Sequence, residues 1–91
     1  MGTEYFVKKI KEYAIELGFS DDEKNEAITM FRECMEDYRF MGHNRYGVVG
    51  GILYYLSIKY RHPLRPVDLT KVLRISAPTI RKNFHLLIKK Y

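Results

Sequence analysis

The residues best suited to chemistry lie near the end of this chain, in the segment LTKVLRISAPTIRKNFHLL from Leu69 to Leu87. The segment predicts a short helix, a tight turn and a second helix, whose first turns hold Pro78, Thr79, Arg81 and Lys82. Side chains in that place can enter the DNA major groove and donate hydrogen bonds to base edges. The segment therefore predicts a helix-turn-helix with duplex DNA as its ligand.

Other residues in and beside this segment suit contacts with the phosphate backbone, which position a protein on DNA without reading sequence. These candidates are Arg65, Lys71, Arg74, Ser76 and Ala77. A solvated basic face is the competing interpretation of the cations. Thr79 has a competing interpretation as well, because its hydroxyl could serve only to cap or bond its own helix.

Side chains for other kinds of chemistry are sparse. The single cysteine, Cys34, lies on an apolar stripe and is expected to be a buried, unreactive thiol. The histidines at 43, 62 and 85 share no spacing typical of metal ligands. With no nucleophile–base pair, carboxylate dyad or phosphate-binding glycine loop, the sequence predicts neither an enzyme nor a bound metal or cofactor.

The charges are segregated along the chain. Residues 1–40 hold six lysines and arginines against ten acids, whereas residues 41–91 hold ten against Asp68 alone. The halves thus carry −4 and +9 within a net charge of +5. Such a dipolar molecule is steered toward a polyanion by its basic side, and its affinity falls with salt.

Length and composition are those of a single small domain over residues 1–91, with eight tyrosines and five phenylalanines for its core. One cysteine excludes an internal disulfide, which favours a reducing, cytoplasmic compartment. The longest apolar run, Val48 to Ile58, is too short and too rich in glycine to span a bilayer. No secretory leader is recognised either, and we expect no contact with a membrane.

Hydrophobic periodicity predicts an all-α chain of five helices, at about residues 4–17, 21–39, 45–60, 67–74 and 77–90. Thr3 is the expected N-cap of the first helix, and Ser20 with Glu23 forms a capping box for the second. Pro66 suits the first position of the fourth helix, and Ser76 caps the fifth.

The helix at 45–60 is apolar nearly all round, so it should be the buried hub of the fold. Glycines at 47, 50 and 51 are costly inside a helix and predict close approach of neighbouring helices. Inward-facing positions of the other helices are expected to be Phe6, Ile10, Tyr13, Leu17, Ala27, Ile28, Phe31, Cys34, Met35, Tyr38, Val67, Leu69, Val72, Leu73, Ile80, Phe84, Leu87 and Ile88.

Three segments resemble one known family. They are YFVKKIKEYAIELG from Tyr5, GHNRYGVVGGILYYLS from Gly42 and ISAPTIRKNF from Ile75. In this order they resemble the second cyclin-like repeat of archaeal transcription factor B, the counterpart of general transcription factor IIB. The resemblance spans almost the whole chain and implies a five-helix cyclin fold with the third helix at its centre.

The same resemblance implies a function in transcription initiation. Members of the family dock on the complex of TATA-box-binding protein with promoter DNA, and the last two helices of the second repeat read DNA beside the TATA box. Arg81 keeps the family's base-reading arginine, whereas Pro78 stands where the family has a valine that touches a base. The preferred DNA sequence is therefore expected to differ. An archaeal, nucleoid-associated protein is implied.

Other departures limit the parallel. Gly50 and Gly51 replace alanines, and Arg74 replaces a turn glycine at which φ should be positive. The family has two such repeats and a zinc ribbon, whereas these residues hold one repeat and no zinc-ligand spacing, so RNA polymerase would be reached only through further domains. The alternative function is a cyclin-like protein-interaction module without sequence-specific DNA contacts, whose acidic half would suit a basic protein.

Overall fold

Five α-helices and one short 3-10 helix make up residues 2–91, the part of the chain that the computed structural model describes. In order they are α1 (Thr3–Leu17), α2 (Asp21–Met35), η1 (Tyr38–Phe40), α3 (Arg45–Lys59), α4 (Pro66–Leu73) and α5 (Ala77–Lys90). No strand occurs in these residues. The predicted all-helical class is confirmed.

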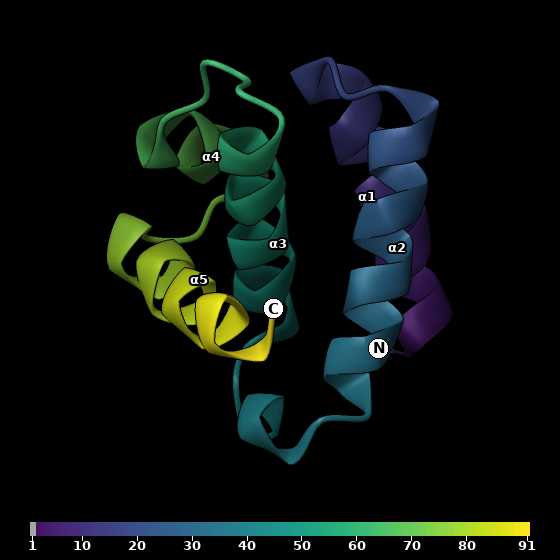
Figure 1. Cartoon of the computed structure of the whole chain (residues 1–91), viewed down its shortest axis with the longest axis vertical. Helices are drawn as coiled ribbons and strands as arrows, with labels where there is room; N and C mark the ends of the chain where they lie inside the picture. Colours follow the sequence, from purple (N-terminus) through teal and green to yellow (C-terminus); the bar gives the residue numbers. More distant parts are fainter. Residues whose placement is uncertain (1) are drawn as a thin grey trace.

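Helix α3 is the centre of the fold. Figure 1 shows it in teal between the α1–α2 pair on one side and the α4–α5 pair on the other. It packs against all four of these helices, and most extensively against α5. Every residue from Gly47 to Leu53 is buried. The hub predicted from the apolar character of this helix is therefore confirmed, and the arrangement is that of a cyclin-like repeat.

Helix α2 begins as predicted but ends earlier. The Ser20 hydroxyl accepts from the Glu23 amide at 3.2 Å, and the Glu23 carboxylate accepts from the Ser20 amide at 2.8 Å. The predicted continuation to residue 39 is wrong because Asp37 adopts an extended backbone (φ −100°, ψ 119°). Its carboxylate caps the Arg39 amide at 2.9 Å and so begins η1. Tyr38, expected to face inward, is consequently exposed.

Helix α1 differs from the expectation at its start. Its N-cap is Gly2, which has no side chain that could accept a hydrogen bond, and the expected cap Thr3 is already the first helical residue. Gly18 ends the helix in the left-handed conformation (φ 81°) as anticipated.

The core contains buried apolar side chains from every helix. Its buried apolar members are Phe6, Val7, Ile10, Tyr13, Ala27, Met30, Phe31, Cys34, Phe40, Val48, Val49, Ile52, Leu53, Leu56, Leu69, Leu73, Ile80 and Leu87. Besides Tyr38, two positions expected to face inward are exposed, namely Val67 and Ile88, and so is Ile58 at the end of the hub helix. Val67 is exposed because Leu69 and Leu73, one turn apart, take the inward positions of α4. Ile58 and Ile88 line a groove between α3 and α5.

Candidate nucleic-acid interface

A tight turn sets the relation between α4 and α5. Arg74 adopts the left-handed conformation (φ 59°, ψ 41°), and its amide donates to the Thr70 carbonyl at 2.8 Å. The positive φ predicted at this position is confirmed, at a cost of roughly 1 kcal/mol for a residue with a Cβ. Ser76 then caps α5 by accepting from the Thr79 amide at 3.4 Å.

The inner face of α5 lies directly on the glycines of α3. A Cβ placed on Gly47 would lie 2.7 Å from Cγ2 of Thr79 and 2.9 Å from Nδ2 of Asn83. A Cβ on Gly51 would lie 2.7 Å from the Asn83 Cβ and 3.0 Å from the Phe84 backbone nitrogen. The predicted close approach is therefore real and involves α5. It leaves the opposite face of α5 turned to solvent.

That outer face carries a basic stripe. It forms an open hollow of about 580 Å³ lined by Pro78, Arg81, Lys82, His85, Leu86 and Lys89 of α5 together with His43. Arg81 and Lys82 are exposed, and within residues 2–91 neither makes an ion pair. The structure thus brings together three of the four base-reading candidates.

Thr79, the fourth candidate, lies apart from this stripe. Its side chain is half-buried, and its methyl group packs toward Gly47 of α3. Its hydroxyl is 2.8 Å from the Ser76 hydroxyl, to which it is hydrogen-bonded. The geometry matches the capping interpretation of Thr79 better than a free base contact.

The phosphate candidates border the α4–α5 turn. Arg65, Lys71, Arg74 and Ser76 are exposed, and Ala77 is half-buried at the start of α5. Arg65 precedes α4, where its amide donates to Oδ2 of Asp68 at 2.8 Å and its guanidinium lies 3.5 Å from Oδ1. These bonds hold the pKa of the Asp68 carboxyl below its usual range, the backbone hydrogen bond contributing most. Lys71 and Arg74 make no ion pair within the described residues.

Sequence reasoning missed that His43, His85 and Lys89 share the outer face of α5. His85 follows Arg81 by four residues and Lys89 follows His85 by four, so helical spacing alone could have placed both on the stripe. His43 comes from the connection before α3, and no signal in the sequence linked it to α5.

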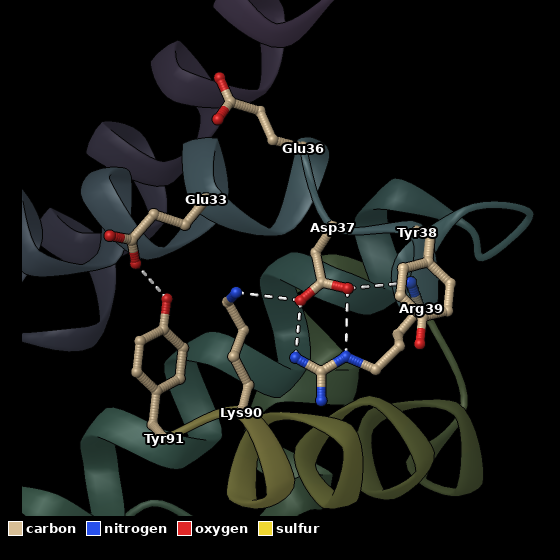
Figure 2. A pocket seen from close by; sticks show the side chains of 7 residues that line it. All are labelled: Glu33, Glu36, Asp37, Tyr38, Arg39, Lys90 and Tyr91. Carbon is tan, nitrogen blue, oxygen red and sulfur yellow. Dashed lines mark hydrogen bonds and ion pairs between the residues drawn. The ribbon is translucent and has the colours of Figure 1, made fainter.

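A second hollow, of about 630 Å³, lies at the other end of α5, and several of the side chains that line it form ion pairs with one another. Figure 2 shows Asp37 accepting from the Arg39 guanidinium at 2.7 Å and 3.1 Å and from the Lys90 ammonium at 2.9 Å. Tyr91 donates to Glu33 beside them. These bonds hold the pKa of Asp37 well below its usual range, Arg39 contributing most. The cluster fastens the end of α5 to α2 and η1.

The remaining candidates for chemistry are structural. Cys34 is buried in the core, and this desolvation raises the pKa of its thiol to about 12. His62 lies 2.9 Å from Oε1 of Glu23 and 4.6 Å from the Phe19 ring, so it joins the α1–α2 and α3–α4 connections.

Within residues 2–91 no group of three or more His, Cys, Asp or Glu side chains could hold a metal ion. None of the helices described is long and apolar enough to cross a membrane.

These features define an all-helical, cyclin-like repeat whose last two helices present a basic outer surface. The family model of the transcription factor TFIIB repeat matches residues 5–90, so the chain belongs to the TFIIB repeat family. This is a family of transcription factors and not of enzymes. No curated protein and no solved structure matches the chain.

Proposed function

We propose that this chain binds promoter DNA through α4 and α5, acting as a helix-turn-helix with α5 in the major groove. The observation that carries the proposal is the outer face of α5. It holds Arg81 and Lys82 exposed and free of ion pairs, while the inner face is fixed against the glycines of α3. A helix held in this way presents its outward side chains without a large entropic loss on binding.

In this proposal Arg81 reads a base. A guanidinium near the start of a recognition helix can donate to O6 and N7 of a guanine, a contact that discriminates by roughly 1–3 kcal/mol. Lys82 lies beside it and Pro78 contributes an apolar contact in place of the family's valine. Thr79 contributes chiefly by holding the first turn of α5 through its bond to Ser76.

Phosphate contacts would come from the residues that border the turn. Lys71 and Arg74 supply cations, Arg65 supplies a third at the start of α4, and Ser76 and Ala77 open α5. Contacts of this kind set register and orientation and respond strongly to salt. With about four phosphates neutralised, log K should fall against log salt with a slope of about −3.6.

Membership of the TFIIB repeat family supports a place in transcription initiation. We propose that the chain resembles the second repeat of archaeal transcription factor B, acting beside the TATA box with TATA-box-binding protein on the archaeal chromosome. Further domains would be needed to engage RNA polymerase.

The test is a gel-shift titration with promoter and random duplexes, each with and without TATA-box-binding protein. Arg81→Ala should reduce the preference for promoter DNA by about tenfold or more, since it removes the base contact. Lys71→Ala is the matched control, which should weaken both duplexes equally and make the salt slope shallower by about one.

An unchanged promoter preference in Arg81→Ala would show that α5 does not read bases. A salt-independent affinity for DNA would remove the electrostatic argument. Either result would favour the alternative, a protein-interaction module without sequence-specific DNA contacts.

A further inference from the structure

Two histidines share the outer face of α5 with the basic stripe, although they lie far apart in the sequence. His85 belongs to α5 itself and is exposed, whereas His43 is half-buried and comes from the connection between η1 and α3. Both line the open hollow of about 580 Å³ together with Arg81 and Lys89. The surface that presents Arg81 therefore extends from α5 onto a second segment of the chain.

The position of His43 is set by bonds on both sides of it. Its amide donates to the Phe40 carbonyl of η1 at 3.2 Å, and Gly42 before it turns the chain with a left-handed φ of 83°. Asn44 after it caps α3, since the Asn44 side chain accepts from the Tyr46 amide at 2.8 Å. His43 is thus held beside α5 by the start of the hub helix, and a ligand finds it already in place.

The charged groups that face His85 are cations. Arg81 and Lys89 lie one helical turn before and one turn after it on α5, and Lys82 lines the same hollow. Within residues 2–91 no carboxylate lines this hollow, and His85 forms no ion pair. No acidic side chain of the hollow is therefore placed to neutralise a charged imidazole.

The surroundings of His43 lack acids as well. It also borders a smaller hollow of about 240 Å³, to which α2, η1 and the start of α3 contribute. The other titratable groups there are the Arg45 guanidinium and the buried Cys34 thiol, which stays neutral because desolvation raises its pKa to about 12. In the described part of the chain no carboxylate lines this second hollow either.

A cationic surface without acids suits an anion, and the ligand proposed for this face is DNA. A neutral imidazole has one N–H donor, whereas a charged imidazole donates from both ring nitrogens and adds a positive charge. Phosphate oxygens accept such hydrogen bonds and favour the charged form. Imidazole is also the side chain whose charge ordinarily changes between about pH 5 and 8. Contact with DNA phosphates should therefore be accompanied by proton uptake at His43 and His85.

We propose that His43 and His85 are phosphate-binding residues of the DNA interface and contact the DNA backbone in their charged form. The inference rests on the proposed function, and it extends the contact surface from α4 and α5 to the connection before α3. Because proton uptake and DNA binding are then linked, the affinity for DNA rises as the pH falls. Lysine and arginine contacts alone give no such dependence near neutral pH.

The test is fluorescence anisotropy of a labelled random-sequence duplex, titrated with the chain at a constant salt concentration of about 0.05 M. Lysine, arginine, carboxylate and phosphodiester charges scarcely change between about pH 8 and pH 6, so histidine dominates the response. We expect the dissociation constant to fall by roughly tenfold or more over this range, since uptake of two protons would allow up to about 100-fold per pH unit.

Four variants assign the response to residues. His43→Gln/His85→Gln cannot take up these protons, so its dissociation constant should change by less than about twofold over the same pH range. His43→Gln alone should lose about half of the logarithmic change, which tests the connection before α3 separately from α5. His43→Lys/His85→Lys keeps a permanent charge at both positions, so at about pH 8 it should bind as tightly as the wild type does at about pH 6.

His62→Gln is the matched control. The His62 imidazole lies 2.9 Å from the Glu23 carboxylate in the connection between α3 and α4 and does not line the hollow. This variant should keep the wild-type pH response. Circular dichroism verifies that each variant keeps its fold.

The outcomes separate this inference from the proposed function. DNA binding that is independent of pH, or a pH response kept by His43→Gln/His85→Gln, would overturn the role of the two histidines and leave the proposed function standing. A response kept in full by His43→Gln would also overturn the inference, because the interface would then not extend beyond α5. Absence of DNA binding at every pH would refute the proposed function, and this inference with it.

Discussion

The contact between α3 and α5 predicts that Gly51→Ala destabilises the protein, although alanine is the better helix former. A Cβ at this position would lie 2.7 Å from the Asn83 Cβ, 3.0 Å from the Phe84 nitrogen and 3.1 Å from the Asn83 carbonyl carbon. Two of these atoms belong to the backbone of α5. No side-chain rotation can relieve the clash, so α5 must move away from α3.

The magnitude is a difference between two effects. Replacing glycine by alanine inside a helix contributes about 1 kcal/mol of stability. Overpacking costs roughly 1–3 kcal/mol, and a clash with backbone belongs at the upper end of that range. The net loss should therefore be about 2 kcal/mol. For a domain of this size it lowers the melting temperature by roughly 8–16 °C.

Gly50→Ala is the matched control in the same helix. Its Cβ would approach Cδ1 of Ile75 at 2.8 Å and Cγ1 of Ile80 at 3.1 Å, and the nearer atom is the end of a flexible side chain. The clash can relax, so we expect a change within about 1 kcal/mol of zero. Urea and thermal unfolding followed by circular dichroism measure both variants. If Gly51→Ala is as stable as Gly50→Ala, or more stable than wild type, the close approach of α5 is wrong.

Three further predictions concern the core and its ion pairs. Leu53→Ala, at the centre of the buried hub, should lower the free energy of unfolding by roughly 2–5 kcal/mol in urea titrations. Asp37→Asn should destabilise the protein at pH 7 and flatten its acid unfolding curve. The depressed pKa of Asp37 makes its contribution to stability complete above the unfolded value of about 3.9 and lost as pH falls toward the folded value. Cys34 should resist an aromatic disulfide reagent in the native protein and react fully in urea, and rapid native labelling would contradict its burial.

Much of the fold could be predicted because local rules and burial agree along most of the chain. The capping box at Ser20, the proline that opens α4 and the glycine that ends α1 each fix a helix boundary by a local mechanism. The apolar character of α3 predicts its central place. The three glycines of α3 predict a close helix contact, though the sequence does not say which helix makes it.

The errors arise where a tertiary interaction overrides the local pattern. The apolar pattern of α2 continues in the sequence through Tyr38. The Asp37 carboxylate instead accepts hydrogen bonds from the Arg39 amide and the Lys90 ammonium, and the regular helix ends before it. Asn83 is polar by type, yet it is buried against Gly47 and Gly51 of α3. Its Nδ2 donates to the Thr79 carbonyl at 2.9 Å, while its Oδ1 has no hydrogen-bond partner in the described residues. Periodicity does place Asn83 on the inner face of α5, three residues after Ile80 and four before Leu87, but its polar type kept it out of the predicted core.

The candidate site was predictable in its residue types and less so in its geometry. Helical spacing alone places Arg81 and Lys82 on the side of α5 opposite Ile80 and Leu87. It does not reveal that the Thr79 hydroxyl is engaged by Ser76, because that bond depends on the side-chain rotamers at the first turn. It does not bring His43 to the same face, because that contact depends on the path of the η1–α3 connection.

Helix α5 therefore contributes to three different surfaces. The inner face of α5 is fixed by the glycines of α3, its outer face carries the unpaired cations, and its carboxyl end shares the apolar groove with α3. Because the inner contact determines how α5 is rotated and placed, a change at Gly51 shifts both other surfaces together. Substitutions at Arg81 or Ile88 alter one outward surface without disturbing the core. This asymmetry allows the stability of the domain and the proposed DNA contact to be tested separately.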